Sequence, residues 1–443
     1  MKSSANENTP ARVPERAKQA GEAAPTEWGW VERSVWTERM LEALHRGVKG
    51  GVWFSLVDKV QRPSTLEAAW ERVRANRGSA GADGQSVEAF DAEAERHLER
   101  LHEELRTGTY RPGPVKRVWI EKPGSRQKRP LGVPTVRDRV VQAALRLVIE
   151  PIFEREFSPR SYGFRPGRGC KDALRRVAQL LAEGNVWVVD ADLKGYFDSI
   201  PHERLMDEVR KRVADGRVLD LIEGFLRQGV LEEAKVWTPE AGTPQGAVIS
   251  PLLANIYLHP VDQAMAAAGQ EMIRYADDFV ILCRSREEAE TALATVDRLM
   301  TERGLTLHPE KTRVVDASVD GFDFLGYHFE RGMRWPRDKS MKKLRDAVRS
   351  KTKRTSGQSL AFIIADVNRT LRGWFEYFQH SHWNVFPGID GWVRRRLRSI
   401  LRKRHKRGGI SRGLDQRRWP NAYFRERGLY SLEAAHRSLL QSR

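Results

Sequence analysis

The chain has 443 residues, 40% of them hydrophobic, and a formal net charge of +18. This length allows two or three domains, and the apolar content excludes a disordered chain. The polar N-terminus and the lack of any long apolar run exclude a secreted or membrane-spanning protein, so we expect a cytoplasmic protein without a membrane partner.

The first part of the chain reads as a tail followed by helices and a hairpin. Residues 1–27 are rich in Ala, Glu, Pro, Asn and Ser, which predicts a flexible tail, and an aromatic helical pattern over residues 28–60 predicts an N-terminal helical extension. A helix follows over residues 64–76, with Ser64 as N-cap and Glu67 completing a capping box. Residues 115–120 and 130–133 predict a β-hairpin whose turn, at residues 122–129, is basic.

The central part of the chain alternates between helical and strand patterns. Residues 136–157 have helical periodicity, and residues 186–191 form a short apolar run of the kind that makes a buried strand. Residues 272–283 read MIRYADDFVILC, which predicts two strands flanking a tight turn. Helices are also expected at residues 202–213, 218–228, 251–265 and 287–303. The two cysteines, Cys170 and Cys283, form no CxxC pair and are expected to be free thiols.

Two adjacent carboxylates, Asp277 and Asp278, fall at the tip of the predicted hairpin. Like charge at one tip is unfavourable unless cations neutralise it, and Mg²⁺ prefers oxygen ligands. The strand at residues 186–191 delivers a third carboxylate, Asp192, directly after its end. The pattern predicts a phosphoryl-transfer site for two Mg²⁺ ions, which Mn²⁺ can replace. An ordinary Asp-Asp surface turn is the alternative.

Seven sequence blocks, read in order, resemble the group II intron-encoded reverse transcriptase/maturase proteins of bacteria, in the form that lacks an HNH endonuclease domain. Retron and diversity-generating reverse transcriptases share the Tyr-x-Asp-Asp box but differ around the Pro-Gln-Gly block. The matching blocks are RPLGVPTVRDRVVQ (129–142), FRPGRGC (164–170), DADLKGYFDSIPH (190–202), GTPQGAVISPLLANIYL (242–258), RYADDFVIL (274–282), GLTLHPEKT (304–312) and DFLGY (323–327).

The resemblance implies an α+β fold of the right-hand polymerase type, with an antiparallel palm sheet, fingers and an all-helical thumb, the maturase domain X. We place the fingers at residues 61–185, the palm with its catalytic triad at residues 186–330 and the thumb at residues 335–409. Residues 410–443 then form a short basic C-terminal segment.

The resemblance also assigns roles around the carboxylates. Asp192, Asp277 and Asp278 match the metal-binding triad, and the backbone carbonyl of Leu193 is expected to bind the metal on the nucleotide side. Phe197 falls where the family has its steric gate, a ring under the sugar that leaves no room for a 2′-hydroxyl and so selects dNTPs. Packing in the core is the alternative for Phe197.

Further residues are expected to bind the incoming dNTP. Gln245, in the Pro-Gln-Gly turn, matches the residue that contacts nucleotide and template. Lys311 matches a lysine that approaches the triphosphate, where it can protonate the leaving group. Lys122, Arg129 and Arg117 on the basic hairpin are suited to bind triphosphate or template phosphates, although a solvated basic turn explains Arg117 equally well.

Two other acidic residues, Asp190 and Asp198, flank the first carboxylate. Asp190 lies two positions before Asp192, so on a strand it shares the face of Asp192 but sits about 7 Å farther from the metals. Asp198 is expected to cap the turn into Pro201. Neither is assigned to the site.

Basic residues are concentrated in the last quarter of the chain. Residues 331–443 hold 29 Lys and Arg against 8 Asp and Glu, a net of +21, so the first 330 residues have a net charge of −3. A helical stretch at residues 360–380 contains GWFEYF, whose rings fit either a thumb core or a base-stacking surface. The helix predicted at residues 392–407 has a dense cationic face, which indicates a polyanion partner. Its candidate nucleic-acid-binding residues are Arg394, Arg395, Arg396, Arg398, Arg402, Lys403, Arg404, Lys406 and Arg407.

These features lead to the hypothesis of an RNA-directed DNA polymerase that copies intron RNA into DNA during retrohoming and assists splicing. Its expected partners are the group II intron RNA, an RNA template with a DNA primer, target DNA, dNTPs and, as an open possibility, a second copy of the chain. Because the zinc-binding cysteine pairs of an HNH domain are absent, the primer is expected to come from elsewhere. Two alternatives stay open: a splicing maturase with a vestigial polymerase site, and a domesticated reverse transcriptase in phage defence or repair.

Overall fold

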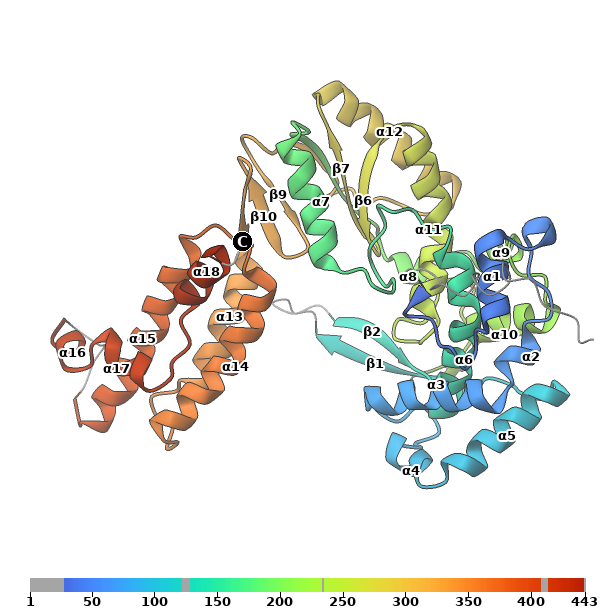
Figure 1. The fold of residues 1–443 in the computed structure, drawn as a ribbon, viewed down its shortest axis with the longest axis horizontal. Helices are drawn as coiled ribbons and strands as arrows, with labels where there is room; N and C mark the ends of the chain where they lie inside the picture. The colour runs from blue at the N-terminus through green and yellow to red at the C-terminus, as the bar shows by residue number, and fades with distance from the viewer. Residues whose placement is uncertain (1–27, 122–127, 233–234, 408–412, 442–443) are drawn as a thin grey trace, which may run out of the picture.

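The computed structural model describes residues 28–121, 128–232, 235–407 and 413–441. Figure 1 shows a large lobe that contains the strands and most helices, and a separate group of helices, α13–α18, at one side. The predicted tail, residues 1–27, and Lys122 lie outside the described residues. Within the described ranges, no helix combines the length and apolarity needed to cross a membrane. The cytoplasmic location stays a prediction.

The N-terminal helices pack against α6 (Val136–Glu154), the central helix of the large lobe. The indole of Trp36 donates a hydrogen bond to the carbonyl of Leu147 in α6 at 3.0 Å, which ties the aromatic extension to that helix. The extension and the helices that follow it are α1 (Glu38–Arg46), the 3-10 turn η3 (Lys49–Gly51), α2 (Val57–Val60), α3 (Pro63–Asn76), α4 (Val87–Asp91) and α5 (Ala94–Thr107).

The predicted start of α3 is wrong. Arg62 is the N-cap and Pro63 occupies the first helical turn, so Ser64 lies inside the helix and makes no capping hydrogen bond. Proline suits this position because its missing N–H would have no intrahelical partner there, and its fixed φ angle is already helical. The proline outweighs the capping-box pattern that the residues after it suggested.

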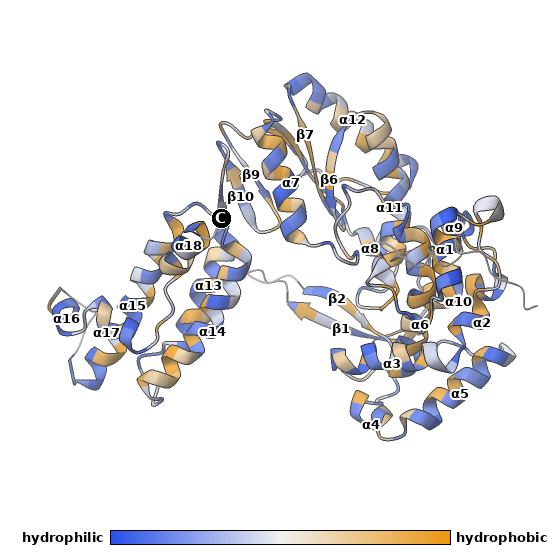
Figure 2. Cartoon of the chain, viewed as in Figure 1, coloured by the Kyte–Doolittle hydropathy of each residue, from blue (hydrophilic) through white to orange (hydrophobic). Residues whose placement is uncertain are grey.

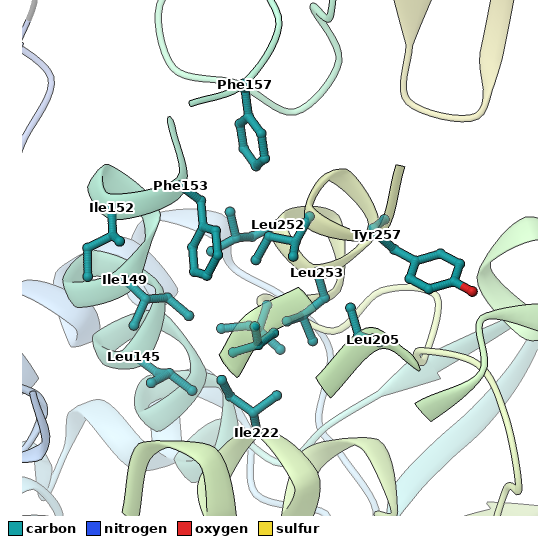
Figure 3. Packing of buried hydrophobic residues seen from close by; sticks show 14 of the residues in the cluster. Leu145, Ile149, Ile152, Phe153, Phe157, Leu205, Ile222, Leu252, Leu253 and Tyr257 are labelled. Carbon is teal, nitrogen blue, oxygen red and sulfur yellow. The ribbon is translucent and has the colours of Figure 1, made fainter. Parts of the chain in front are cut away.

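The main hydrophobic core lies between α6 and three later helices. Figure 3 shows Leu145, Ile149 and Phe153 of α6 facing Leu253 of α11 and Ile222 of α10. Figure 2 shows hydrophobic residues gathered around α6 and α10, while α5 at the margin is largely hydrophilic. The three later helices are α9 (His202–Arg210), α10 (Gly216–Leu226) and α11 (Ser250–Ala267).

The palm sheet has the strand order β6-β7-β3-β8, and its neighbouring strands are antiparallel, which confirms the predicted palm sheet. Helices α11 and α12 (Arg286–Glu302) contact one face, and α7 (Cys170–Ala182) contacts the other. The strands are β3 (Trp187–Asp192), β6 (Glu271–Tyr275), β7 (Asp278–Cys283) and β8 (Arg313–Asp316). Helices therefore cover both faces of the palm sheet.

A second, mixed sheet forms the fingers. Its order is β2-β1-β4-β5, with β1 antiparallel to β2 and parallel to β4. In Figure 1 the β1–β2 hairpin projects from the large lobe toward the thumb helices. The strands are β1 (Val115–Glu121), β2 (Lys128–Val133), β4 (Val230–Glu232) and β5 (Lys235–Trp237).

A small antiparallel sheet connects the palm to the thumb. Its order is β11-β10-β9, and it spans the boundary that the sequence placed between residues 330 and 335. The hydroxyl of Tyr327 donates to the carbonyl of Tyr377 in the thumb at 2.6 Å. The strands are β9 (Phe322–Phe324), β10 (Tyr327–Glu330) and β11 (Met333–Pro336).

The thumb is helical, as predicted, and residues 413–441 pack against its longer helices. Trp419, Phe424 and Leu432 are buried in the same core as the longer thumb helices. Residues 413–441 are therefore packed against the thumb, because these large apolar side chains complete its core. The helices are α13 (Asp338–Lys351), α14 (Leu360–Phe378), α15 (Val385–Arg404), α16 (Gly413–Arg418), α17 (Asn421–Glu426) and α18 (Leu432–Gln441).

Candidate active site

The predicted carboxylates converge at one end of the palm sheet. Asp192 ends β3 and is the direct cross-strand partner of Asp278, which begins β7. Asp277 lies in the tight connection between β6 and β7, the catalytic turn (residues 275–278), where Tyr275 pairs with Asp278. Ala276 in this turn has a φ of 61°, the left-handed conformation that a two-residue hairpin requires.

The electrostatics of this group reflect its crowding. Burial, followed by the charges of Asp190, Asp277 and Asp192, raises the pKa of Asp278 to about 7. Burial is also the main cause of the raised pKa of Asp277, to which the charge of Asp192 adds. The carboxylates therefore repel one another, and cations at this position would relieve that repulsion.

The loop before β8 holds the end of β3 in place. The amide of His308 donates to the carbonyl of Asp192 at 2.8 Å, and the amide of Lys194 donates to the carbonyl of Thr306 at 3.0 Å. Leu193 forms an isolated bridge with Leu307 and is buried. This pairing orients the backbone at Asp192 and Leu193, the two residues expected to serve the metals from this strand.

Lys311 lies on the same loop, and its ammonium contacts the carboxylate of Asp192. The structure thus brings the predicted leaving-group acid to the predicted triad. More than half of the Lys311 side chain surface is exposed, so the ammonium can reach a bound ligand.

The donor set suits a divalent cation that prefers oxygen ligands, because Asp192, Asp277 and Asp278 supply carboxylates with unrelieved mutual repulsion. Across the described residues, no three Asp, Glu, His or Cys side chains converge closely enough to hold a metal ion in this arrangement. The ammonium of Lys311 contacts one of the two carboxylate oxygens of Asp192, Oδ2.

Asp190 interacts more strongly with the predicted metal ligands, through its charge, than the strand spacing suggested. It contacts Arg313 at 3.3 Å, yet among the neighbouring charges it has the largest effect on the pKa of Asp278. The strand spacing by itself predicted that Asp190 lies outside the site. The cross-strand register explains the coupling, since Asp190 and Asp192 lie on the same sheet face as Asp278.

Phe197 lies on α8 (Tyr196–Ser199), just after the first carboxylate, and its ring is half-buried. The ring centroid lies 6.3 Å from that of Phe164 and 5.6 Å from that of Tyr196, both edge-on. The carbonyl of Phe197 accepts a hydrogen bond from the amide of Thr243 at 2.6 Å. The ring is thus held but partly accessible, which a gate needs and a fully buried core residue would lack.

Gln245 lies in a turn that is hydrogen-bonded to α8 on one side and to β2 of the fingers sheet on the other. Its carbonyl accepts a hydrogen bond from the amide of Gly132 in β2 at 2.6 Å. Gly246 has a φ of 108°, and a Cβ there would lie 2.7 Å from the carbonyl oxygen of Gly132. A cavity of about 280 Å³ opens beside this turn, and Arg117, Asp198 and Gln245 line it.

Arg117 and Arg129 lie on opposite faces of the fingers sheet. Arg117 pairs with Gly132 and Arg129 pairs with Ile120, and residues 117 and 120 are an odd number of positions apart on one strand. The Arg117 guanidinium lies 5.1 Å from the ring centroid of Trp237 and lines the cavity beside Gln245, whereas Arg129 is exposed. The structure therefore does not bring these two predicted phosphate ligands together.

Within the cationic thumb helix, some predicted RNA-binding side chains are internal. The guanidinium of Arg398 is buried and donates to the carbonyl of Trp419 at 2.9 Å and to Asn421 at 2.7 Å. Arg402 contacts Asp415 at 2.9 Å. The prediction for Arg398 is wrong, because its charge is used to join α15 to the segment that follows.

Two further candidates for RNA binding make contacts within the thumb, and the remaining candidates are exposed. Arg396 donates to the hydroxyl of Thr352 at 2.6 Å, and Arg394 lies 4.0 Å from Asp390. The exposed members, which stay candidates for nucleic-acid contact, are Arg395, Lys403, Arg404, Lys406 and Arg407.

The aromatic residues of GWFEYF form a joint between palm and thumb. Phe375 packs in the thumb core, whereas Phe378 packs against the palm and its ring centroid lies 5.0 Å from that of Tyr327. Trp374 contacts both clusters. Of the two interpretations of this motif, core packing holds for these three rings.

The buried residues that contact the catalytic turn were not predicted from the sequence. Arg274 is 1% exposed, and its partners Asp262 and Asn255 on α11 are also buried. A signal for Arg274 was present, because an arginine inside an apolar strand must find buried partners. The sequence offered no means of identifying those partners.

Comparisons with known proteins agree with these observations. A family profile described as "Reverse transcriptase (RNA-dependent DNA polymerase)" matches residues 120–329, and one described as "Group II intron, maturase-specific domain" matches residues 341–419. The protein YkfC of Escherichia coli (strain K12) is 33% identical over 317 residues, which are 62% of this chain and 83% of YkfC.

Two further matches are partial. The Group II intron-encoded protein LtrA of Lactococcus lactis subsp. cremoris is 39% identical over 202 residues, which are 46% of this chain and 33% of LtrA. The match therefore spans about a third of that relative. Among solved structures, a partial Cas6-RT-Cas1–Cas2 complex is 26% identical and covers 56% of this chain and 41% of its own, with a TM-score of 0.37 that is too low to inform the fold.

Proposed function

The chain belongs to the group II intron-encoded reverse transcriptases with a maturase-specific domain, and we propose that it is an RNA-directed DNA polymerase that copies its intron RNA into DNA and assists splicing of that RNA. The observation that supports polymerase activity most strongly is the cross-strand pairing of Asp192 with Asp278, next to Asp277 in the turn. A surface Asp-Asp turn would not be matched by a third carboxylate from a distant strand.

The residues of the site have separate tasks in this proposal. Asp192, Asp277 and Asp278 would hold two Mg²⁺ ions, which supply the charge that activates a primer 3′-hydroxyl and steadies the triphosphate. Lys311 donates a proton from Nζ toward the leaving pyrophosphate. Phe197 lies beneath the sugar and excludes a 2′-hydroxyl, which restricts the substrate to dNTPs.

Gln245 and Arg117 serve the opposite side of the site. The carbonyl of Gln245 is fixed to β2 by its hydrogen bond with the amide of Gly132, and Gln245 lines the adjoining cavity. Both observations support a role for its side chain in contacting nucleotide and template. Arg117 lines the adjoining cavity and is suited to a phosphate. Arg129, on the other sheet face, is better placed for the template strand than for the same phosphate.

Nucleic-acid binding is assigned mainly to the thumb. Its net charge of +21 over residues 331–443 contrasts with −3 for the rest of the chain. The proposed ligands are an RNA template with a DNA primer, the intron RNA and the target DNA, which present the same phosphate backbone to these cations. A homodimer stays a prediction.

Primer extension tests this function. The purified chain with Mg²⁺ and dNTPs should extend a DNA primer on an RNA template, and Asp277→Ala should abolish extension while RNA binding persists. Asp207→Ala, which removes an exposed carboxylate of α9 paired with Arg210, is the matched control and should extend normally. Equal extension by Asp277→Ala contradicts the assignment. Tight intron binding without extension by the wild type would favour a splicing maturase with a vestigial site.

A further inference from the structure

A buried guanidinium lies directly beneath the catalytic turn. Arg274, the last residue but one of β6, donates from Nε and Nη2 to both carboxylate oxygens of Asp262 at 2.7 and 2.5 Å. Its Nη1 donates to the side-chain carbonyl of Asn255 at 2.9 Å and to the backbone carbonyl of Ala276 at 2.9 Å. One side chain thus joins α11 to the turn that contains Asp277.

The same network reaches the loop on the other side of the turn. The Asn255 side-chain amide donates to the carbonyl of Gly163 at 2.8 Å. A Cβ on Gly163 would lie 2.2 Å from the amide nitrogen of Ala276, so the two backbones are in direct contact. The amide of Tyr162 also donates to the carbonyl of Arg274 at 2.9 Å. Residues 162–163 therefore contact the backbone of the turn on one side, and the buried side chain of Arg274 contacts it on the other.

The segment of α11 that contacts Arg274 also contacts α8. The hydroxyl of Tyr196 donates to the carbonyl of Ala254 at 2.5 Å, and Tyr196 directly precedes Phe197. Residues 254 and 255 of α11 therefore connect to both the catalytic turn and α8. A shift of this segment would move the carboxylates and the gate ring relative to each other.

Stability alone does not explain a buried ion pair here. Desolvation of two charges offsets most of their attraction, and a well-packed apolar pair of similar volume is often as stable. What an apolar pair cannot supply is directed hydrogen bonding. Arginine has five N–H donors in a rigid fork, and here that fork meets the Asp262 carboxylate, the Asn255 amide and the Ala276 carbonyl at once.

We propose that Arg274, oriented by Asp262 and Asn255, is a positioning residue that holds the catalytic turn in the arrangement needed for nucleotidyl transfer. The proposal rests on the proposed polymerase function. Arg274 touches no substrate; it acts through the Ala276 carbonyl, which keeps this residue in its left-handed conformation and so directs Asp277 and Asp278. Losing such positioning lowers the rate of chemistry more than it lowers nucleotide affinity.

The test separates positioning from stability. Arg274→Met alone leaves Asp262 buried and unpaired, so reduced folding is expected. The double variant Arg274→Met/Asp262→Leu removes both charges and should recover the melting temperature to near that of the wild type. It should still show a kcat for dNTP incorporation that is about 100-fold lower, with KM for the dNTP changed by less than about threefold.

A milder variant and a matched control complete the set. Asn255→Ala breaks the link to Gly163 without leaving a charge unpaired, and a roughly tenfold loss in kcat is expected. The control Arg146→Met/Glu150→Leu removes an ion pair of 2.6 Å on α6 that does not contact the turn, and it should retain wild-type kcat.

Hydrogen–deuterium exchange of the metal-free protein provides a readout independent of activity. The amides of residues 276–279 should exchange faster in Asn255→Ala and in the Arg274 double variant than in the wild type and the control. Recovery of both melting temperature and kcat in the double variant, or wild-type kcat in folded Asn255→Ala, would overturn the proposal. Failure of the wild type itself to extend a primer would instead refute the proposed function.

Discussion

The ammonium of Lys311 contacts the carboxylate of Asp192, a residue 119 positions earlier in the chain. The contact joins the group proposed to protonate the leaving pyrophosphate to a carboxylate proposed to hold the metals. The contact uses one carboxylate oxygen of Asp192, Oδ2, so the ammonium and the carboxylate offset part of each other's charge. We expect nucleotide and metal to compete with this contact for Lys311 and Asp192.

Replacing Lys311 should therefore affect chemistry more than binding. Lys311→Met is expected to lower kcat by about 10²-fold or more, within the range for general acid catalysis, with a smaller change in KM. Single-turnover primer extension measures this effect. Lys211→Met, which removes an exposed lysine of a surface ion pair, is the control and should behave as wild type. A Lys311 variant with normal kcat would exclude the acid role.

Phe197→Val should relax sugar selection. A smaller side chain leaves room for a 2′-hydroxyl, so kcat/KM for rNTPs is expected to rise while that for dNTPs changes little. Competing incorporation of a matched dNTP and rNTP on one template measures the ratio, for which we expect a shift of about tenfold or more. If Phe197 is instead a core residue, kcat/KM should fall equally for dNTPs and rNTPs, and the melting temperature should fall as well.

Gly246→Ala should impair the Pro-Gln-Gly turn. The added Cβ would lie 2.7 Å from the Gly132 carbonyl oxygen and 2.8 Å from the Leu131 side chain, so β2 and the turn must separate. We expect a raised KM for dNTPs and a lower kcat in primer extension. Gly269→Ala, with a φ of 74° and no atom within 4 Å of its Cβ, carries the backbone strain alone. It should cost about 1 kcal/mol of stability without loss of activity.

Asp278→Asn should stabilise the metal-free protein at neutral and basic pH. The pKa of Asp278 is raised to about 7 in the folded chain, mainly by burial and then by Asp190, against about 3.9 when unfolded. Its contribution to stability is therefore present below about pH 4 and is lost as the pH rises to about 7. With a chelator at about pH 8, the variant should melt a few degrees above the wild type.

The difference in melting temperature between Asp278→Asn and the wild type should disappear at acidic pH and become smaller when Mg²⁺ is added. Below about pH 4 the wild-type carboxyl is protonated in both states, so the melting temperatures should agree. Mg²⁺ should raise the melting temperature of the wild type and leave the variant nearly unchanged. A variant that melts below the wild type in chelator at about pH 8 would contradict this electrostatic description.

The thumb cations should fall into two classes. Lys403→Ala and Lys406→Ala remove exposed charges, and each is expected to reduce the salt dependence of RNA binding by about 0.7 to 0.9 in the slope of log K against log salt. Arg398→Met should instead lower the melting temperature, because its guanidinium joins α15 to residues 419 and 421. Filter-binding titrations at several salt concentrations, with thermal melts, separate the classes.

Elements with a strong local period were predictable from the sequence. The run MIRYADDFVILC gives β6 and β7 with the expected turn, because apolar β-forming residues flank a polar pair. The start of α3 was missed because Pro63 outcompeted a capping pattern. The packing of residues 413–441 into the thumb was missed because the aromatic residues there have no periodicity that identifies their partners.

Within the site, residue type and spacing predicted Asp192, Asp277 and Asp278 as a group of metal ligands, because adjacent carboxylates are unfavourable unless cations neutralise them. Their register did not follow from spacing. The pairing of Asp192 with Asp278 depends on how β3 and β7 align, and it decides that Asp190 shares the sheet face of Asp278. The separation of Arg117 and Arg129 onto opposite faces likewise depends on the register of β1 and β2.

The sequence by itself determined which residue types are available for chemistry: three carboxylates at the ends of apolar strands, a basic C-terminal quarter and the motif blocks in their order. Only the tertiary structure decided which charges are free to act. Arg398 and Arg274 are buried by contacts with distant segments, whereas Lys403 and Lys406 stay exposed. The sequence does not distinguish a buried charged residue from an exposed one of the same type. The partner and the solvent exposure of such a residue are set by packing between parts of the chain that no local sequence pattern connects.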